Sequence, residues 1–226
     1  MVKGEELEQI YARRFGKTRV YRNKVWAVLC GSFFNRLVKR DDRVLDLGCG
    51  YGDFINQIEC GERFGMDLNP ASRELLKDGV EFLEQDCSTR WPFKDGELDV
   101  VFTSNFFEHL PNKEALERTI EEVGRCLRTG GKLVALGPNY NRLHGKYWDF
   151  WDHHVALTEL SLRELLELKG FKVTICEGSF LPYTMEGGRM YPLWFVSLYL
   201  KLKLAWRIFG KQFLVVGEWQ GLEQEK

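Results

Sequence analysis

A glycine-rich turn beside acidic residues is the part of this sequence best suited to bind a ligand. The segment that starts at residue 44 reads VLDLGCGYGD and places Gly48, Gly50 and Gly52 directly after a short apolar run. Glycines let the backbone turn sharply and let a ligand lie against it without meeting a Cβ atom. The pattern predicts a strand, a ligand-binding turn and then a helix.

The acids near this turn indicate which ligand it accepts. A dinucleotide-binding turn has the spacing Gly-x-Gly-x-x-Gly, which would require a glycine where this chain has Asp53. Asp46 precedes the glycines, and its carboxylate would repel a pyrophosphate but could accept a hydrogen bond from an ammonium group. The turn therefore favours a nucleoside that carries an amino acid over a dinucleotide.

Two further acids follow the next two predicted strands. Asp67 could accept hydrogen bonds from both hydroxyls of a ribose, and Asp86 could accept one from the exocyclic amine of adenine. Because parallel strands end at the same edge of a sheet, Asp46, Asp67 and Asp86 are expected to face one crevice.

The elements that must position these residues alternate between strand-like and helix-like patterns from residue 43 onward, which predicts an α/β fold with helices on both faces of a mostly parallel sheet. Asn69-Pro70 and Asn112 are expected to begin helices, with Gly130-Gly131 ending the second of them. Residues 161–169 predict another helix, and residues 138–157 predict a long loop. Seven strands are expected, at 43–47, 63–67, 80–85, 97–103, 132–136, 171–176 and 213–218.

Length and composition favour a single domain over residues 1–226. Within it we expect a helical cap at 1–40, a ligand-binding core at 41–180, an apolar insertion at 181–212, and a last strand with its tail at 213–226. Lys and Arg total 32 against 33 Asp and Glu, and this balance argues against a nucleic-acid partner. Six cysteines without a CxxC pair, and no apolar leader or membrane-spanning run, predict a cytoplasmic protein.

Five segments resemble the successive motifs of class I S-adenosylmethionine-dependent methyltransferases: DLGCGYG, MDLNP, EQDCS, DVVFTSNFFEHLPN and LRTGGKLVALGPN. The resemblance is nearest to the "type 11" small-molecule branch and covers about residues 40–137. Three later segments, YWDFWDHHVALTE, FLPYT and AWRIFGKQFLVV, resemble a bacterial subgroup that is associated with glycan or cell-envelope biosynthesis. The resemblance implies a Rossmann-like, seven-stranded sheet and S-adenosylmethionine as the cofactor.

The resemblance also implies which residues bind this cofactor. The turn would hold the methionine part, Asn105 would line the same end, Asp67 would hold the ribose and Leu68 would pack on the purine. Asp86 with Cys87 would bind the adenine. The full expected set is Asp46, Leu47, Gly48, Cys49, Gly50, Asp67, Leu68, Asp86, Cys87 and Asn105.

Histidines are the candidates for removing a proton from the methyl acceptor. Methyl transfer needs an aligned nucleophile and, for a hydroxyl, a base. His153 or His154, oriented by Asp149 or Asp152, could be that base, or these histidines could cap the next helix. His109 is either structural or directed at the substrate.

No metal is expected. Quinone-precursor O-methyltransferases carry a Glu-x-x-Glu-His motif that has been linked to a metal, and this chain has Asn105 in place of the first acid before Glu108 and His109.

An apolar segment at 191–210 carries only Lys201, Lys203 and Arg207 as charges. It could pack on the sheet, form a homodimer interface, or contact a membrane surface or a lipid-linked substrate.

The sequence as a whole predicts methyl transfer from S-adenosylmethionine to an oxygen or nitrogen of a small molecule, such as a sugar or a lipid-linked glycan precursor. The alternatives are a non-catalytic protein that binds the cofactor and a partner, and a NAD(P)-dependent oxidoreductase, against which Asp46 and Asp53 argue.

Overall fold

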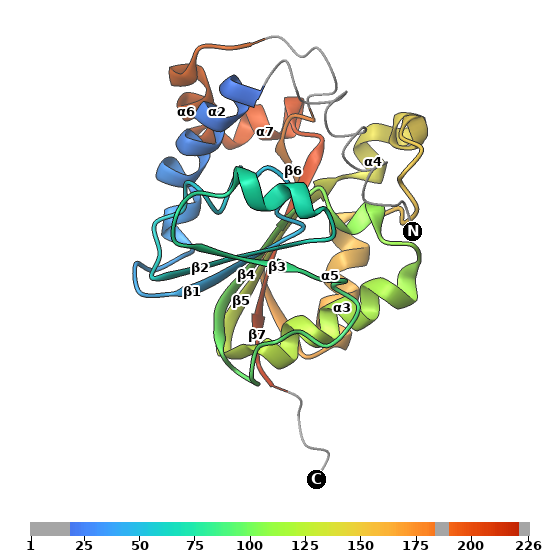
Figure 1. Ribbon diagram of the computed structural model, residues 1–226. Coiled ribbons are helices and arrows are strands. Elements are labelled where there is room, and N and C mark those ends of the chain that lie inside the picture. The colour runs from blue at the N-terminus through green and yellow to red at the C-terminus, as the bar shows by residue number, and fades with distance from the viewer. Residues whose placement is uncertain (1–18, 184–189, 222–226) are drawn as a thin grey trace.

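A single seven-stranded sheet forms the centre of the computed structural model, which describes residues 19–183 and 190–221 of the chain. Its strand order is β3-β2-β1-β4-β5-β7-β6 (Figure 1). The strands are β1 (Arg43–Leu47), β2 (Glu62–Asp67), β3 (Val80–Glu84), β4 (Leu98–Ser104), β5 (Leu127–Pro138), β6 (Phe171–Leu181) and β7 (Gln212–Trp219). The first five are parallel, whereas β7 runs antiparallel to both β5 and β6. The predicted mostly parallel, seven-stranded sheet is confirmed.

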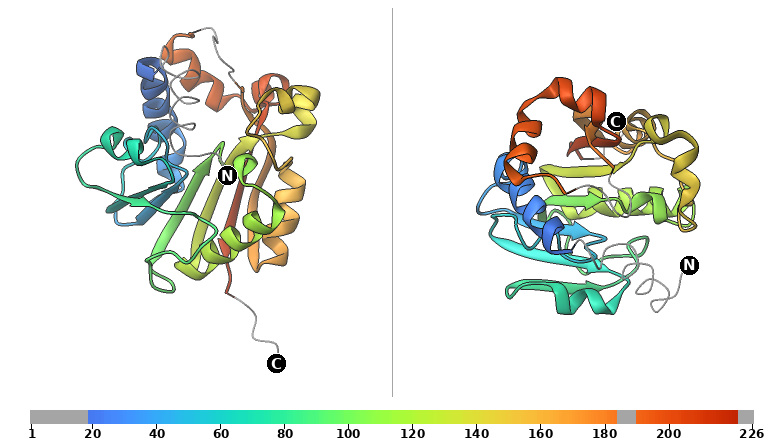
Figure 2. Two further views of the ribbon diagram at one scale, coloured as in Figure 1. Left: turned by 45° about the vertical axis from the view of Figure 1, so that its right-hand side comes forward. Right: turned by 90° about the horizontal axis from the view of Figure 1, so that it is seen from above.

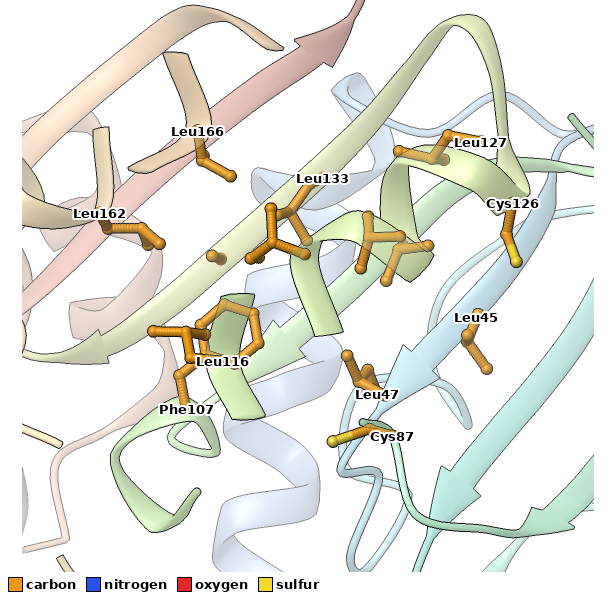
Figure 3. Packing of buried hydrophobic residues seen from close by; sticks show 14 of the residues in the cluster. Leu45, Leu47, Cys87, Phe107, Leu116, Cys126, Leu127, Leu133, Leu162 and Leu166 are labelled. Carbon is orange, nitrogen blue, oxygen red and sulfur yellow. The ribbon is translucent and has the colours of Figure 1, made fainter. Parts of the chain in front are cut away.

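Helices cover both faces of this sheet, as predicted (Figure 2). On one face lie α3 (Lys113–Cys126) and α5 (Glu159–Leu168), which bury leucines against the strands (Figure 3). On the other lie α2 (Arg19–Ser32), the 3₁₀ helix η1 (Phe34–Arg36), α6 (Leu193–Lys201) and α7 (Lys203–Phe209). The sheet therefore has a separate hydrophobic core on each side.

Helix α3 shows how the sequence sets an element and where the prediction was wrong. Asn112 caps it, because its side chain accepts a hydrogen bond from the backbone N–H of Ala115 at 2.8 Å. Leu127 was expected to continue the helix, but it pairs with Leu98 as the first residue of β5. The glycines Gly130-Gly131 thus lie inside β5 and do not separate helix from strand. A register shift between Leu98 and Val100 accommodates this early start.

The helix expected after the glycine turn is replaced by consecutive hydrogen-bonded turns over residues 50–57. The side chain of Asn56 binds the backbone of Leu75 and Lys77, so this stretch is tied to its neighbour by side-chain bonds. Asn69 does cap a helix that begins with Pro70, but it is the 3₁₀ helix η2 (Pro70–Leu75).

The predicted loop at 138–157 contains two short helices, α4 (Tyr140–Leu143) and the 3₁₀ helix η4 (His144–Asp149). The α2 and η1 helices confirm a helical N-terminal segment, and the part of the predicted cap before residue 19 lies outside the described residues. The boundaries of the core and the apolar insertion stay predictions. Among the described helices, none is long and apolar enough to cross a membrane.

Candidate active site

The glycine turn follows β1 and lies against the segment that follows the neighbouring strand β4. Gly48 has a φ of +71°, which side-chain-bearing residues rarely adopt. A Cβ atom on Gly48 would lie only 2.3 Å from the Phe106 ring. Phe106 belongs to the segment that follows β4, so the absence of a side chain at Gly48 lets this segment pack directly on the turn.

Two buried carboxylates accept hydrogen bonds from the backbone of the turn and of the residues near it. Asp67, at the end of β2, accepts one hydrogen bond from the backbone N–H of Gly50 and one from that of Asn69, both at 2.8 Å. Asp46 accepts a bond from the N–H of Ile55 at 3.3 Å. Both aspartates are less than a tenth exposed. Their positions agree with the expectation that the strand ends bring these acids to one edge.

The ionised forms of the acids at this edge are poorly stabilised by the protein around them. Burial raises the pKa of Asp46 well above its usual range, and the charges of Asp53 and Asp67 raise it further. Burial also raises the pKa of Asp67, although its backbone hydrogen bonds oppose the effect. A ligand with positive charge would relieve this repulsion. A pyrophosphate would increase it.

Asn105 adds a buried acceptor to the same edge. It follows β4, and its φ of +51° is an uncommon conformation for a residue with a side chain. Its Nδ2 donates to Ser104 Oγ at 3.1 Å, but its buried Oδ1 has no hydrogen-bond partner among the residues that the structure describes. Buried polar atoms are normally satisfied, so this oxygen suits the ammonium of a ligand.

The other expected cofactor residues differ in whether their side chains are exposed. Leu68 is 39% exposed beside Asp67, and half-buried Asp86 uses its Oδ1 to accept bonds from the backbone and hydroxyl of Ser88. The side chains of Leu47, Cys49 and Cys87 are buried, so only their backbone could reach a cofactor.

A second group of polar residues lies after β4, in the 3₁₀ helix η3 (Phe107–His109). The carbonyl oxygen of Glu108 accepts hydrogen bonds from the N–H groups of His154 and Val155, at 2.8 and 3.2 Å. These two bonds fix the loop after η4 against η3. As a result, His109 and Asp152 lie together although they are far apart in the sequence.

His109 occupies the centre of this acid–histidine cluster, which we define as Glu108, His109, Asp152 and His153. Its Nδ1 lies 2.9 Å from the carbonyl oxygen of Asp152 and 3.3 Å from a carboxylate oxygen of the same residue. Its Nε2 lies 3.8 Å from Glu108 Oε1. The His153 ring contacts the His109 ring, with centroids 4.9 Å apart, and also packs against Tyr147 and Phe150.

The surroundings of Glu108 and His109 raise the pKa of both groups. Glu108 is 1% exposed, and its Oε1 has no hydrogen-bond partner within residues 19–183 and 190–221. Burial raises the pKa of Glu108 to about 7, with the charge of His109 opposing this and that of Asp152 adding to it. Burial lowers the pKa of His109, but its hydrogen bond to Asp152 and the charge of Glu108 outweigh that effect and raise it.

The structure selects among the predicted catalytic residues. His109 and His153 are brought together, whereas His154 is exposed and offers its backbone N–H to Glu108. Asp149 is exposed, and Asp152 contacts His109. Sequence reasoning named Glu108 only as part of a metal motif and missed its place in this cluster, although an acid beside a histidine directly after β4 was a usable signal.

The cluster also contains atoms that could ligate a metal. Glu108, His109 and His153 each offer one ligand atom, and these atoms lie within 4.8 Å of one another. The expectation from the sequence, that no metal is bound, stays a prediction.

Comparison with known proteins agrees with this geometry. Residues 45–135 match the family model described as "Methyltransferase domain". An uncharacterized protein of Methanocaldococcus jannaschii is 33% identical over 149 residues, which are 64% of this chain and 61% of that protein. The sarcosine/dimethylglycine N-methyltransferase of Halorhodospira halochloris is 30% identical over 120 residues, which are 47% of this chain and 41% of that enzyme. The chain thus spans less than two thirds of the length of these curated relatives.

A solved structure of a SAM-dependent methyltransferase from Archaeoglobus fulgidus has a TM-score of 0.62 and 22% identity. The alignment covers 87% of this chain and 94% of that one. The fold is that of the class I methyltransferases. Together with the family match, it indicates S-adenosylmethionine as the cofactor.

Proposed function

We propose that this chain transfers a methyl group from S-adenosylmethionine to an oxygen or nitrogen atom of a small molecule. The observation that carries the proposal is the pair of buried carboxylates at the glycine turn, Asp46 and Asp67, at the same sheet edge as Asn105 Oδ1, which has no hydrogen-bond partner among the described residues. S-adenosylmethionine carries an ammonium and a sulfonium, so its charge matches this edge. The relative that methylates sarcosine and dimethylglycine supports a small acceptor.

The chain's own residues hold the cofactor in this proposal. Asp46 and Asn105 accept hydrogen bonds from the ammonium group, and Asp67 accepts them from the ribose hydroxyls. Leu68 covers the purine, and Asp86 binds its exocyclic amine. When bound, S-adenosylmethionine supplies a methyl group whose leaving thioether is neutral, so no acid is needed at the leaving group.

The acid–histidine cluster then acts on the acceptor. If His109 donates its Nδ1 proton to the Asp152 carbonyl, the lone pair of Nε2 faces Glu108 Oε1 across 3.8 Å. An acceptor hydroxyl within hydrogen-bond reach of these atoms loses its proton to His109 or Glu108 as it attacks the methyl group, whereas an acceptor ammonium first loses a proton to one of them and then attacks as the neutral amine. His153 packs against His109 and, with Tyr147 and Phe150, forms an aromatic wall that excludes water from this proton transfer.

The acceptor class that we propose is a sugar or a lipid-linked glycan precursor. Aromatic rings line the loop around His153, and rings of this kind stack on the apolar faces of sugars. This part of the proposal also rests on the resemblance of YWDFWDHHVALTE to a subgroup associated with glycan biosynthesis.

Calorimetric titration with S-adenosylhomocysteine, with NADH as the comparator, tests the cofactor assignment. Micromolar binding of S-adenosylhomocysteine alone, about −8 kcal/mol, is the expected result. Binding of NADH alone would overturn the proposal.

Turnover is tested separately with S-adenosylmethionine labelled on its methyl group. Sugar nucleotides are screened first as acceptors, followed by small amines and hydroxylated aromatics. Cofactor binding without label transfer to any acceptor class would favour a non-catalytic cofactor-binding protein.

A further inference from the structure

Helices α6 and α7 expose large apolar side chains that neither core uses. Seven of them are between 41% and 70% exposed: Trp194, Phe195, Leu198, Leu202, Leu204, Ile208 and Phe209. Exposed apolar side chains at this density on two short helices are typical of an interaction surface. We call these seven residues the apolar face.

The two helices are nevertheless firmly attached to the rest of the protein. Tyr199, Leu200 and Trp206 are buried in the core beneath them. The hydroxyl of Tyr199 donates to the carbonyl oxygen of Phe180, and the indole N–H of Trp206 donates to that of Tyr199, both at 2.9 Å. Each helix therefore has a buried side that holds it and an exposed side that is apolar.

The charged residues of the two segments that carry and flank the apolar face are all basic, and one of them, Arg22, already pairs with Asp53 at 2.6 Å. Residues 190–211 and helix α2 together contain no acidic residue, although an average stretch of this length in the chain would contain about five. Their basic residues are Arg19, Arg22, Lys24, Lys201, Lys203, Arg207 and Lys211. The two segments are neighbours, because the Tyr21 hydroxyl donates to the Tyr191 carbonyl oxygen at 2.8 Å and accepts from its N–H at 2.9 Å.

We propose that α6 and α7, with Arg19 and Lys24 of α2, bind the surface of an anionic lipid bilayer. Short helices with Trp, Phe and Leu on one side and Lys or Arg beside them are suited to lie in the plane of the interface. The basic side chains would pair with anionic headgroups. A second copy of the chain is a poorer occupant, because a symmetric contact would bring these like charges together. The binding does not depend on the proposed methyl transfer.

The position of the surface gives this binding a consequence for the site. In Figure 2, α6 and α7 lie at the end of the sheet toward which β4 runs, and Asn105 follows β4 at that end. A bilayer bound there would lie on the same side of the protein as the candidate active site.

Cosedimentation of the full chain with vesicles tests the proposal. Vesicles of phosphatidylcholine alone are compared with vesicles that also contain phosphatidylglycerol. We expect at least about tenfold stronger binding to the anionic vesicles and a decrease as salt is added. Absence of binding to the anionic vesicles would overturn the proposal.

Charge reversal identifies the cationic residues involved. The combined variant Lys201→Glu, Lys203→Glu and Arg207→Glu is expected to lose binding by about tenfold or more. The matched control is Lys94→Glu, Arg118→Glu and Lys172→Glu, which changes the net charge equally at exposed positions elsewhere. An equal loss in both variants would mean that net charge, and not this surface, drives binding.

The apolar contribution is tested with Trp194→Ser and Leu204→Ser combined. Leu160→Ser and Leu168→Ser on α5 are the control, because these leucines are also exposed and apolar. Binding should fall only in the first pair, and circular dichroism confirms that both pairs remain folded. If light scattering instead shows a dimer that only the first pair abolishes, and vesicles do not bind, the occupant is a second copy and the proposal fails.

Discussion

The glycine turn and the acid–histidine cluster both bury carboxylates at the ends of parallel strands, yet they treat them differently. Asp67 accepts two backbone N–H groups, which fix both of its oxygens in place. Glu108 is buried as deeply, but its Oε1 has no such donor in the described part of the chain and faces a histidine. A carboxylate fixed by backbone donors is suited to accept hydrogen bonds from a ligand in a fixed geometry. A carboxyl whose unbonded oxygen faces a histidine is suited to take and release a proton.

The largest expected effect separates the two regions by cofactor binding. Asp67→Ala removes the acceptor for the ribose hydroxyls and should weaken S-adenosylhomocysteine binding by roughly 100-fold or more, since each hydrogen bond to a charged group contributes about 1.5–3 kcal/mol. Asp67→Asn keeps the side chain's size and one acceptor oxygen, and should lose less. Calorimetry measures both. Normal binding by a folded Asp67→Ala protein would contradict the ribose assignment.

Glu108→Gln should produce the opposite pattern. We expect kcat to fall by about 100-fold with the acceptor found in the screen, because the variant cannot accept a proton there. Affinity for S-adenosylhomocysteine should change by less than about twofold. In the wild type, kcat should rise with pH through about 7 as Glu108 loses its proton. If Glu108→Gln instead loses cofactor affinity and keeps kcat, the cluster binds the cofactor and does not accept a proton.

Gly48→Ala should destabilise the junction between β1 and β4 by about 2 kcal/mol, because it combines an unfavourable φ with a collision with Phe106. Urea denaturation of Gly48→Ala, Phe106→Ala and the double variant measures the coupling. The double variant should lose less free energy of unfolding than the two single variants lose together. The reason is that removing the Phe106 ring relieves the collision but leaves the backbone strain at position 48. If the losses in the free energy of unfolding are fully additive, the packing of Phe106 does not depend on the missing side chain at Gly48.

Glu108 should also make stability depend on pH. Its pKa is raised to about 7, so the folded state binds more protons than the unfolded state between about pH 4.5 and 7. Stability from this group is therefore present at low pH and lost as the pH rises through that window. The free energy of unfolding of Glu108→Gln relative to the wild type, measured by urea denaturation, should improve from pH 5 to pH 8 by roughly 2–3 kcal/mol. An unchanged difference across this range would contradict the raised pKa.

The smallest expected effect concerns a metal. Extensive treatment with EDTA should change neither Tm nor cofactor affinity, because the cluster is proposed to hold protons and not an ion. Zinc that raises the Tm of the wild type but not of His153→Ala would reassign the cluster as a metal site.

Elements set by local sequence patterns, and the sheet edge to which they bring their ends, could be predicted from the sequence, whereas individual contacts between distant segments could not. The expected strand at 43–47 and the Asn112 cap are confirmed, because both follow from local patterns. The pairing of His109 with Asp152 was missed, since it depends on backbone bonds between η3 and a loop more than 40 residues later. The start of β5 at Leu127 was missed because its partner Leu98 lies in another strand.

The place of β7 has a consequence for the order in which the protein can fold. This strand is the last of the described strands along the chain, yet it lies between β5 and β6 and pairs with both. Until β7 arrives, β5 keeps an open edge and β6 has no strand to pair with. Such unpaired edges invite aggregation. If residues 212–219 pair late during folding, the edges of β5 and β6 therefore stay unpaired for longer, and the chain is exposed to aggregation for longer.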